Sequence, residues 1–90
     1  MSLYNHTRLT LNPLFRMQYE QAQGCHVLLY PEGMVSLSDS AAEILTCFAH
    51  EKRLADVIVL IESRYPGIAL QEDIIEFVEI AYEKHWLKSC

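Results

Sequence analysis

The sequence predicts an α+β domain in which a three-stranded antiparallel sheet is followed by a bundle of three helices. Two extended segments, 25–30 and 34–37, flank Pro31 and Gly33, which favour the backbone angles of a tight turn. After residue 38 the apolar residues change to helical spacing. A hairpin this apolar needs a cover, so the helices are expected to pack on the sheet.

The distribution of apolar residues predicts three strands. Residues 14–20 alternate apolar and polar side chains, which predicts a first strand. Residues 25–30 are almost continuously apolar, as is typical of a central strand. Residues 34–37 carry neither charge nor proline, the features that normally protect an edge strand. We therefore expect this strand either to pair with another chain or to be covered by an N-terminal strand.

Three helices are expected after the hairpin. A capping box of Ser40 and Glu43 predicts the start of the first. The second is expected from residue 54 to Tyr65, and the third over about 71–85. The ninety residues fit one small domain. We place it at 14–90, after a flexible N-terminal arm at 1–13 that ends in a sequence unfavourable for helix.

Composition excludes several classes of function. The net charge of −5 disfavours nucleic acid and anionic membrane surfaces as partners, and no apolar run approaches the roughly 18 residues of a membrane span. The three cysteines and four histidines lack disulfide or metal-ligand spacing, so no metal or other cofactor is expected. A reducing cytoplasm is the simplest compartment. No phosphate loop or paired catalytic carboxylates indicate an enzyme.

Two other functions stay open at this point. Three strands with three helices resemble the winged helix-turn-helix plan of DNA-binding regulators, whose third helix enters the major groove. The acidic face of this third helix would repel phosphates, and it favours either solvent or a cationic partner. Ser40 after Asp39 also resembles the modified serine of acyl carrier proteins, although a hairpin precedes it here instead of a helix. The acidic face consists of Glu72, Glu76, Glu79 and Glu83.

Four blocks of sequence resemble the PqqD family. They are FRMQYE at 15–20, AQGCHVLLYPEGMVSL at 22–37, SDSAAEIL at 38–45 and EKHWL at 83–87. The resemblance covers nearly the whole chain from residue 14 to residue 87. Where the family usually has Lys-Gly-Trp, this chain has His85 between Lys84 and Trp86, which puts the geometry of the helix end in question.

The resemblance implies a non-catalytic peptide chaperone without a cofactor of its own. Such a protein binds the precursor peptide PqqA in pyrroloquinoline quinone (PQQ) biosynthesis and presents it to the radical SAM enzyme PqqE. The same fold serves as a recognition element in other modified-peptide pathways. There the peptide adds as a strand to the third strand and lies against the third helix. The exposed strand edge could alternatively join two copies into a homodimer. The expected peptide-binding residues are Met34, Val35, Ser36 and Leu37 on the strand, and Ile75, Glu76, Glu79 and Tyr82 on the helix.

Overall fold

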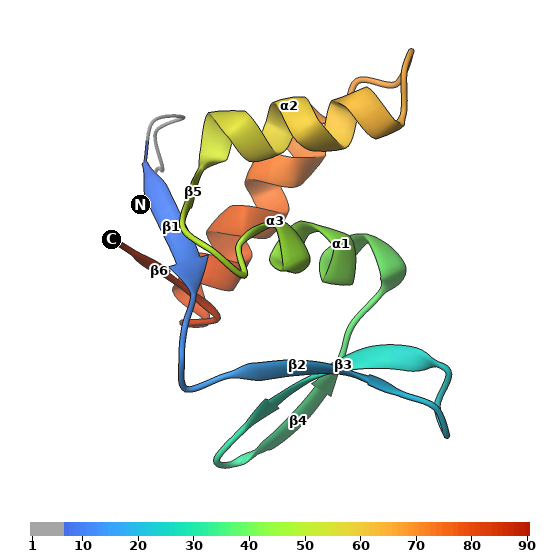
Figure 1. The fold of residues 1–90 in the computed structure, drawn as a ribbon, viewed down its shortest axis with the longest axis vertical. Helices are drawn as coiled ribbons and strands as arrows, with labels where there is room; N and C mark the ends of the chain where they lie inside the picture. Colours follow the sequence, from blue (N-terminus) through green and yellow to red (C-terminus); the bar gives the residue numbers. More distant parts are fainter. Residues whose placement is uncertain (1–6) are drawn as a thin grey trace.

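In the computed structural model, which describes residues 7–90, two three-stranded sheets and three helices surround one core (Figure 1). This arrangement confirms the predicted α+β class. No helix in residues 7–90 is long and apolar enough to span a membrane. The elements are β1 (Arg8–Leu11), β2 (Arg16–Glu20), β3 (Cys25–Tyr30), β4 (Gly33–Ser36), α1 (Asp39–Cys47), β5 (Lys52–Arg53), α2 (Leu54–Arg64), α3 (Gln71–Glu83) and β6 (Leu87–Ser89).

The predicted hairpin forms the sheet β2-β3-β4, in which neighbouring strands are antiparallel and β3 is central. The predicted bounds of β3 are confirmed. Strand β4 begins and ends one residue earlier than predicted, because Gly33 already pairs with Tyr30 across the turn. Strand β2 pairs with the opposite side of β3, so it leaves the outer edge of β4 uncovered.

A second sheet, ordered β5-β1-β6, was not predicted. Residues 8–11, which the sequence analysis assigns to the flexible arm, form its central strand, and Leu9 within it is fully buried. The partners of β1 come from residues 52–53 and 87–89. Strands this short, paired across such sequence distances, leave no readable period. Residues 1–6 of the expected arm lie outside the described residues.

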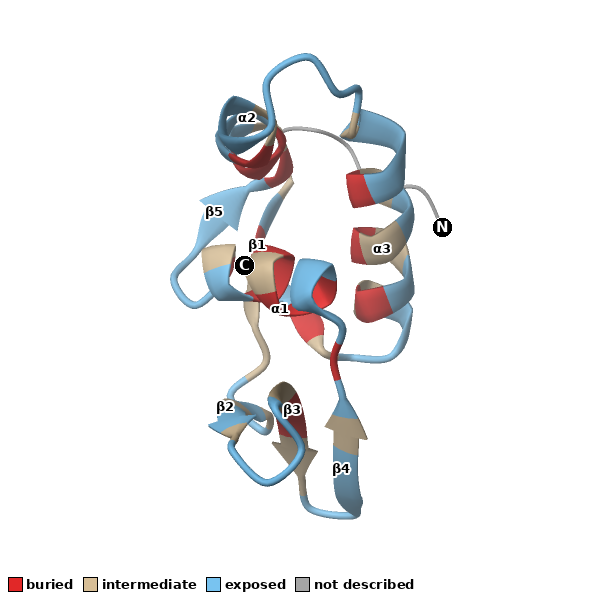
Figure 2. Ribbon diagram, turned by 90° about the vertical axis from the view of Figure 1, so that its right-hand side faces the viewer, coloured by how far each residue is buried: buried red, intermediate tan, exposed pale blue. Residues whose placement is uncertain are grey.

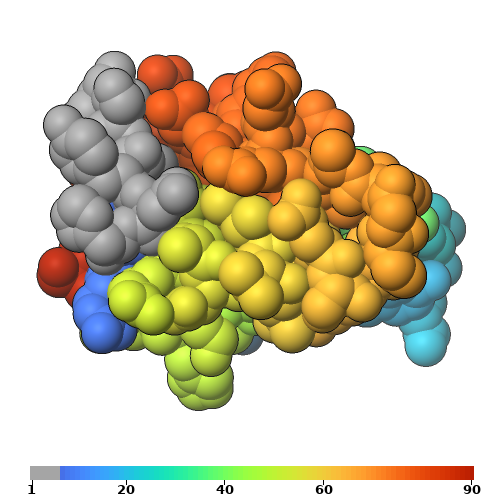
Figure 3. Space-filling model, turned by 90° about the horizontal axis from the view of Figure 1, so that it is seen from above, coloured from blue at the N-terminus to red at the C-terminus, as the bar shows by residue number. Residues whose placement is uncertain are grey.

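The core lies where the three helices face one another. Figure 2 shows the buried residues of α1, α2 and α3 on their inward sides, with exposed residues outside. In the space-filling view, α2 (yellow) and the segment leading into α3 (orange) lie side by side (Figure 3). The largest fully buried side chains of the helices are Leu45, Leu54, Val57 and Val78, and Phe48 at the C-cap of α1 is also fully buried.

The start of α1 and the end of α3 can be compared with the helix ends expected from the sequence. The capping box of Ser40 and Glu43 was wrong: α1 begins after Ser38, whose Oγ accepts a hydrogen bond from the Ala41 N–H at 3.1 Å. Helix α3 ends at Glu83, and His85 beyond it has φ = 66°. Histidine is among the residues that tolerate this left-handed conformation, so the helix end forms without glycine.

The buried position of Leu9 predicts that β1 is essential to the fold. Replacing a fully buried leucine by alanine costs about 2–5 kcal/mol, so Leu9→Ala should strongly lower the free energy of unfolding in urea. The control is Leu14→Ala, because Leu14 is 71% exposed and such surface changes usually stay within about 0.5 kcal/mol. Equal stabilities of the two variants would show that β1 is a dispensable arm.

Candidate functional site

Strand β4 is an edge strand with a free outer side. Its inner side pairs with β3, and no strand within residues 7–90 pairs with its outer side. Figure 1 shows β4 at the lower end of the molecule, away from the helices. It carries neither a charged side chain nor a proline, either of which would discourage pairing with a further strand.

The register shows which backbone groups of β4 are free. The Leu37 N–H donates to the His26 carbonyl at 2.9 Å, and opposed residues in an antiparallel pair alternate between bonded and non-bonded pairs. Val35, opposite Leu28, is therefore bonded to β3. Ser36, opposite Val27, is not. By the same alternation the N–H and C=O groups of Ser36 and of Met34 point to the free edge.

The side chains of β4 follow the predicted alternation. Val35 packs against the core and Leu37 is 5% exposed, whereas Met34 is 48% exposed and Ser36 is also exposed. The Ser36 hydroxyl donates to Gln23 Oε1 at 3.3 Å, which ties the edge strand to the turn between β2 and β3. The inward side chains hold β4 to the core, so its outward backbone groups stand on a fixed support.

The helix residues of the predicted site lie on one flank of α3. Ile75 and Tyr82 are half-buried against the core, while Glu76 is exposed and Glu79 partly exposed. Tyr82 also borders a shallow hollow with Leu87–Ser89 of β6. The structure therefore places the Ile75–Tyr82 flank toward β6. Its contact with a peptide on β4 stays a prediction.

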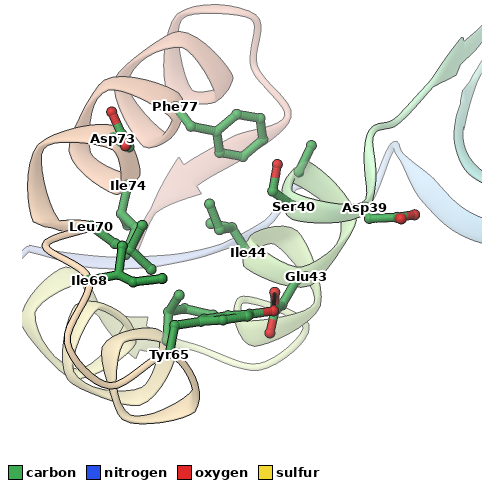
Figure 4. A pocket seen from close by; sticks show the side chains of 12 residues that line it. Asp39, Ser40, Glu43, Ile44, Tyr65, Ile68, Leu70, Asp73, Ile74 and Phe77 are labelled. Carbon is green, nitrogen blue, oxygen red and sulfur yellow. Dashed lines mark hydrogen bonds between the residues drawn. The ribbon is translucent and has the colours of Figure 1, made fainter.

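A larger hollow of about 560 Å³ lies between the start of α1, the end of α2 and the first half of α3 (Figure 4). It adjoins the opposite flank of α3, where the Phe77 ring points toward Ser40, while Asp73 and Asp39 lie at opposite ends of the hollow (Figure 4). Sequence reasoning missed this hollow because its lining is spread over three helices, whose relative placement no local pattern reveals. Its other lining residues are Ala41, Glu43, Ile44, Ile61, Tyr65, Ile68, Leu70 and Ile74.

A polar network closes the far end of the hollow. Arg64 Nη1 donates to Glu43 Oε2 and the Tyr65 hydroxyl donates to Glu43 Oε1, both at 2.8 Å. These hydrogen bonds, first from Arg64 and then from Tyr65, hold the pKa of Glu43 below its usual value. The bond to Glu43 raises the pKa of Tyr65. The network joins α1 to the end of α2 and so fixes one wall of the hollow.

Within residues 7–90, the cysteines and histidines singled out in the sequence lie apart or point away from one another. Cys25 and His26 are neighbours on β3 and point to opposite faces. The His26 ring instead meets Tyr19 edge-on, with centroids 5.2 Å apart. Burial raises the pKa of the Cys47 thiol, which disfavours its reactive thiolate. In the part of the chain from residue 7 to residue 90, no group of three or more His, Cys, Asp or Glu could hold a metal ion.

Comparison with known proteins identifies the family. The family model of coenzyme PQQ synthesis protein D (PqqD) matches residues 25–87. This chain belongs to the PqqD family. The PqqA binding protein of Azotobacter vinelandii is 47% identical over 75 residues, which are 82% of each chain. That of Pseudomonas fluorescens strain Pf-5 is 49% identical over 77 residues, covering 84% of this chain and 85% of the relative. These matches confirm the resemblance seen in the sequence.

A solved structure shows the same fold. The solution NMR structure of the PqqD truncation of Methylobacterium extorquens PqqCD has a TM-score of 0.78 and 19% identity, covering 97% of this chain and 95% of the other. That protein is described as a functional, stand-alone recognition element for ribosomally synthesized and post-translationally modified peptides. The arrangement of sheets and helices in this PqqD chain is thus an experimentally observed one.

The Glu43 network predicts a pH-dependent contribution to stability. Because the folded-state pKa of Glu43 is lowered from 4.5, its contribution is present above that value and is lost as pH falls through the folded pKa. Glu43→Gln should therefore destabilise the protein in urea at about pH 7 and much less at about pH 3. The control is Glu32→Gln in the exposed hairpin turn. An equal cost of Glu43→Gln at both pH values would contradict the assignment.

Proposed function

We propose that this chain is a non-catalytic chaperone of PQQ biosynthesis that binds the precursor peptide PqqA by adding it as a strand to β4. The observation that carries the proposal is the free edge of β4, with the N–H groups of Met34 and Ser36 directed outward. The relatives named PqqA binding proteins support PqqA as the peptide. Strand addition is a general mode of peptide recognition in which backbone hydrogen bonds contribute affinity.

The backbone groups alone do not account for tight binding. Met34 and Ser36 each offer one N–H and one C=O group, which makes four hydrogen bonds to an added strand. At a net 0.5–1.5 kcal/mol each, these contribute roughly 2–6 kcal/mol. Association itself costs an estimated 4–15 kcal/mol. Side-chain contacts must supply the difference, and they also provide the sequence selectivity that backbone bonds lack.

The predicted second wall of the site is the flank of α3 with Ile75, Glu76, Glu79 and Tyr82. Its carboxylates would attract basic residues of the peptide. The same charge counts against the alternative of a DNA-binding regulator, because duplex phosphates would be repelled.

We place the protein in the cytoplasm, where it presents PqqA to the radical SAM enzyme PqqE, as the family resemblance implies. A homodimer through β4 would use the same outward N–H and C=O groups. Because β4 has only one unpaired edge in residues 7–90, a second copy and the peptide would compete for it and exclude each other.

Two proline substitutions test the strand addition. Val35→Pro removes an N–H that bonds to β3 and should destabilise the protein by about 3 kcal/mol or more. Ser36→Pro removes an outward N–H, which an edge strand tolerates. It should leave the urea unfolding curve almost unchanged and weaken binding of the Azotobacter vinelandii PqqA peptide at least tenfold, or about 1.4 kcal/mol.

Ser36→Ala is the matched control, because it removes the hydroxyl bond to Gln23 and keeps the backbone donor. It should bind the peptide nearly as the wild type does. A folded Ser36→Pro variant with wild-type affinity would rule out strand addition at β4.

The acidic flank can be tested by salt dependence. Exposed ion pairs contribute about 0.2–1 kcal/mol each and are screened by salt, so peptide binding should weaken modestly at about half-molar salt. The double change Glu76→Gln with Glu79→Gln should remove most of this dependence. Glu72→Gln with Glu83→Gln, which removes the same charge from α3, should remove less. Identical salt slopes for the two double variants would place the peptide away from the Ile75–Tyr82 flank.

A further inference from the structure

We propose that the hollow between α1, α2 and α3 is a second subsite, which takes an apolar side chain of the bound peptide from a position next to a lysine or arginine. The inference rests on the proposed strand addition to β4 and deepens it. Backbone pairing at β4 would set where the peptide lies, and the hollow would select among peptides.

The hollow is within reach of a strand paired with β4. Strand β4 ends at Ser36, and the end of the hollow nearest to β4 is lined by Asp39 and Ser40, three and four residues further along. An extended chain advances about 3.3 Å per residue, so this end of the hollow lies within roughly 13 Å of the end of β4. A peptide that continues past Ser36 by three or four residues can place a side chain there.

The lining of the hollow suits an apolar side chain. Ile44, Ile61 and Ile74 are buried residues that form its walls, and Figure 4 shows the Phe77 ring directed into the same space. At the opposite end, in the loop between α2 and α3, Ile68 is 56% exposed, and an apolar ligand there would remove its apolar surface from water. The volume of about 560 Å³ falls within the usual range of ligand sites, which is about 300–1,000 Å³.

An aspartate at each end of the hollow favours a basic neighbour in the peptide. Asp39 and Asp73 have no hydrogen bond or ion pair from their side chains within residues 7–90, whereas Glu43 is bound by Arg64 and Tyr65. Both aspartates stand in the first turn of a helix, so part of their charge complements the helix dipole. No lysine or arginine lines the hollow, so the remaining negative charge is available to a cationic ligand group.

The test measures binding of the Azotobacter vinelandii PqqA peptide by calorimetry. Phe77→Ala removes part of a wall of the hollow, and Ile68→Ser removes an exposed apolar group at its α2–α3 end. Each should weaken binding about fivefold or more, as truncation of a contributing interface residue does. Ile68 is exposed, so Ile68→Ser should fold even if Phe77→Ala does not. Val59→Ser is the control, because Val59 is 68% exposed on α2 and does not line the hollow.

The peptide side of the contact is tested by alanine scanning of PqqA. At one apolar position of the peptide, alanine should weaken binding to the wild-type protein and weaken binding to Ile68→Ser far less. Alanine at a neighbouring lysine or arginine should likewise weaken binding to the wild type more than to the double variant Asp39→Asn with Asp73→Asn. Wild-type affinity of both hollow variants, combined with loss of binding in Ser36→Pro, would overturn the subsite and leave strand addition standing. If the hollow variants lose self-association and keep peptide binding, the subsite is overturned and the hollow instead holds a second copy of this chain. Unchanged binding by Ser36→Pro would refute the proposed function itself.

Discussion

An extended strand directs its backbone groups alternately to its two sides, and β4 has a partner on only one of them. Its fold and its proposed function therefore use different residues. Val35 bonds to β3 and packs its side chain on the core, whereas Met34 and Ser36 leave their N–H and C=O groups to water. A sheet edge without charges or proline is a hazard for most proteins. In this PqqD-family chain the same free edge is the proposed place where the peptide adds as a further strand.

The second sheet ties two of the helices together at their C-terminal ends. The Leu11 N–H donates to the Phe48 carbonyl at the end of α1, and the Asn12 N–H donates to the Trp86 carbonyl beyond α3, both at 2.8 Å. The Asn12 side chain also donates to the His85 carbonyl at 2.8 Å. The residues around β1 thus tie the ends of two helices to one strand. This linkage fixes the C-terminal ends of α1 and α3 relative to each other.

Local patterns predicted much of this fold, and the two failures have different physical causes. The hairpin was readable because a turn and two apolar strands are adjacent in sequence, and the three helices because their apolar spacing is regular. Strand β1 was missed since its partners, residues 52–53 and 87–89, lie far along the chain. The start of α1 was misplaced because Ser38 and Ser40 both suit a capping position, and only the backbone shows that Ser38 accepts from Ala41.

The candidate site was predictable in its strand and less so in its helix. Alternation showed that Ser36 faces solvent, but the direction of its N–H depends on the register with β3. The flank of α3 that faces the hollow depends on how the helix is rotated about its axis, which the acidic and apolar stripes do not determine. The flank with Phe77 adjoins the hollow, while the predicted residue Tyr82 borders β6.

The most direct test of strand addition is amide hydrogen exchange of the isotope-labelled protein by NMR, with and without saturating PqqA peptide. The Val35 amide is already bonded to β3 in the free protein, so its protection should change little. The Met34 and Ser36 amides should pass from fast exchange in the free protein to strong protection in the complex. Saturable peptide binding that leaves the exchange of Met34 and Ser36 unchanged would contradict the account.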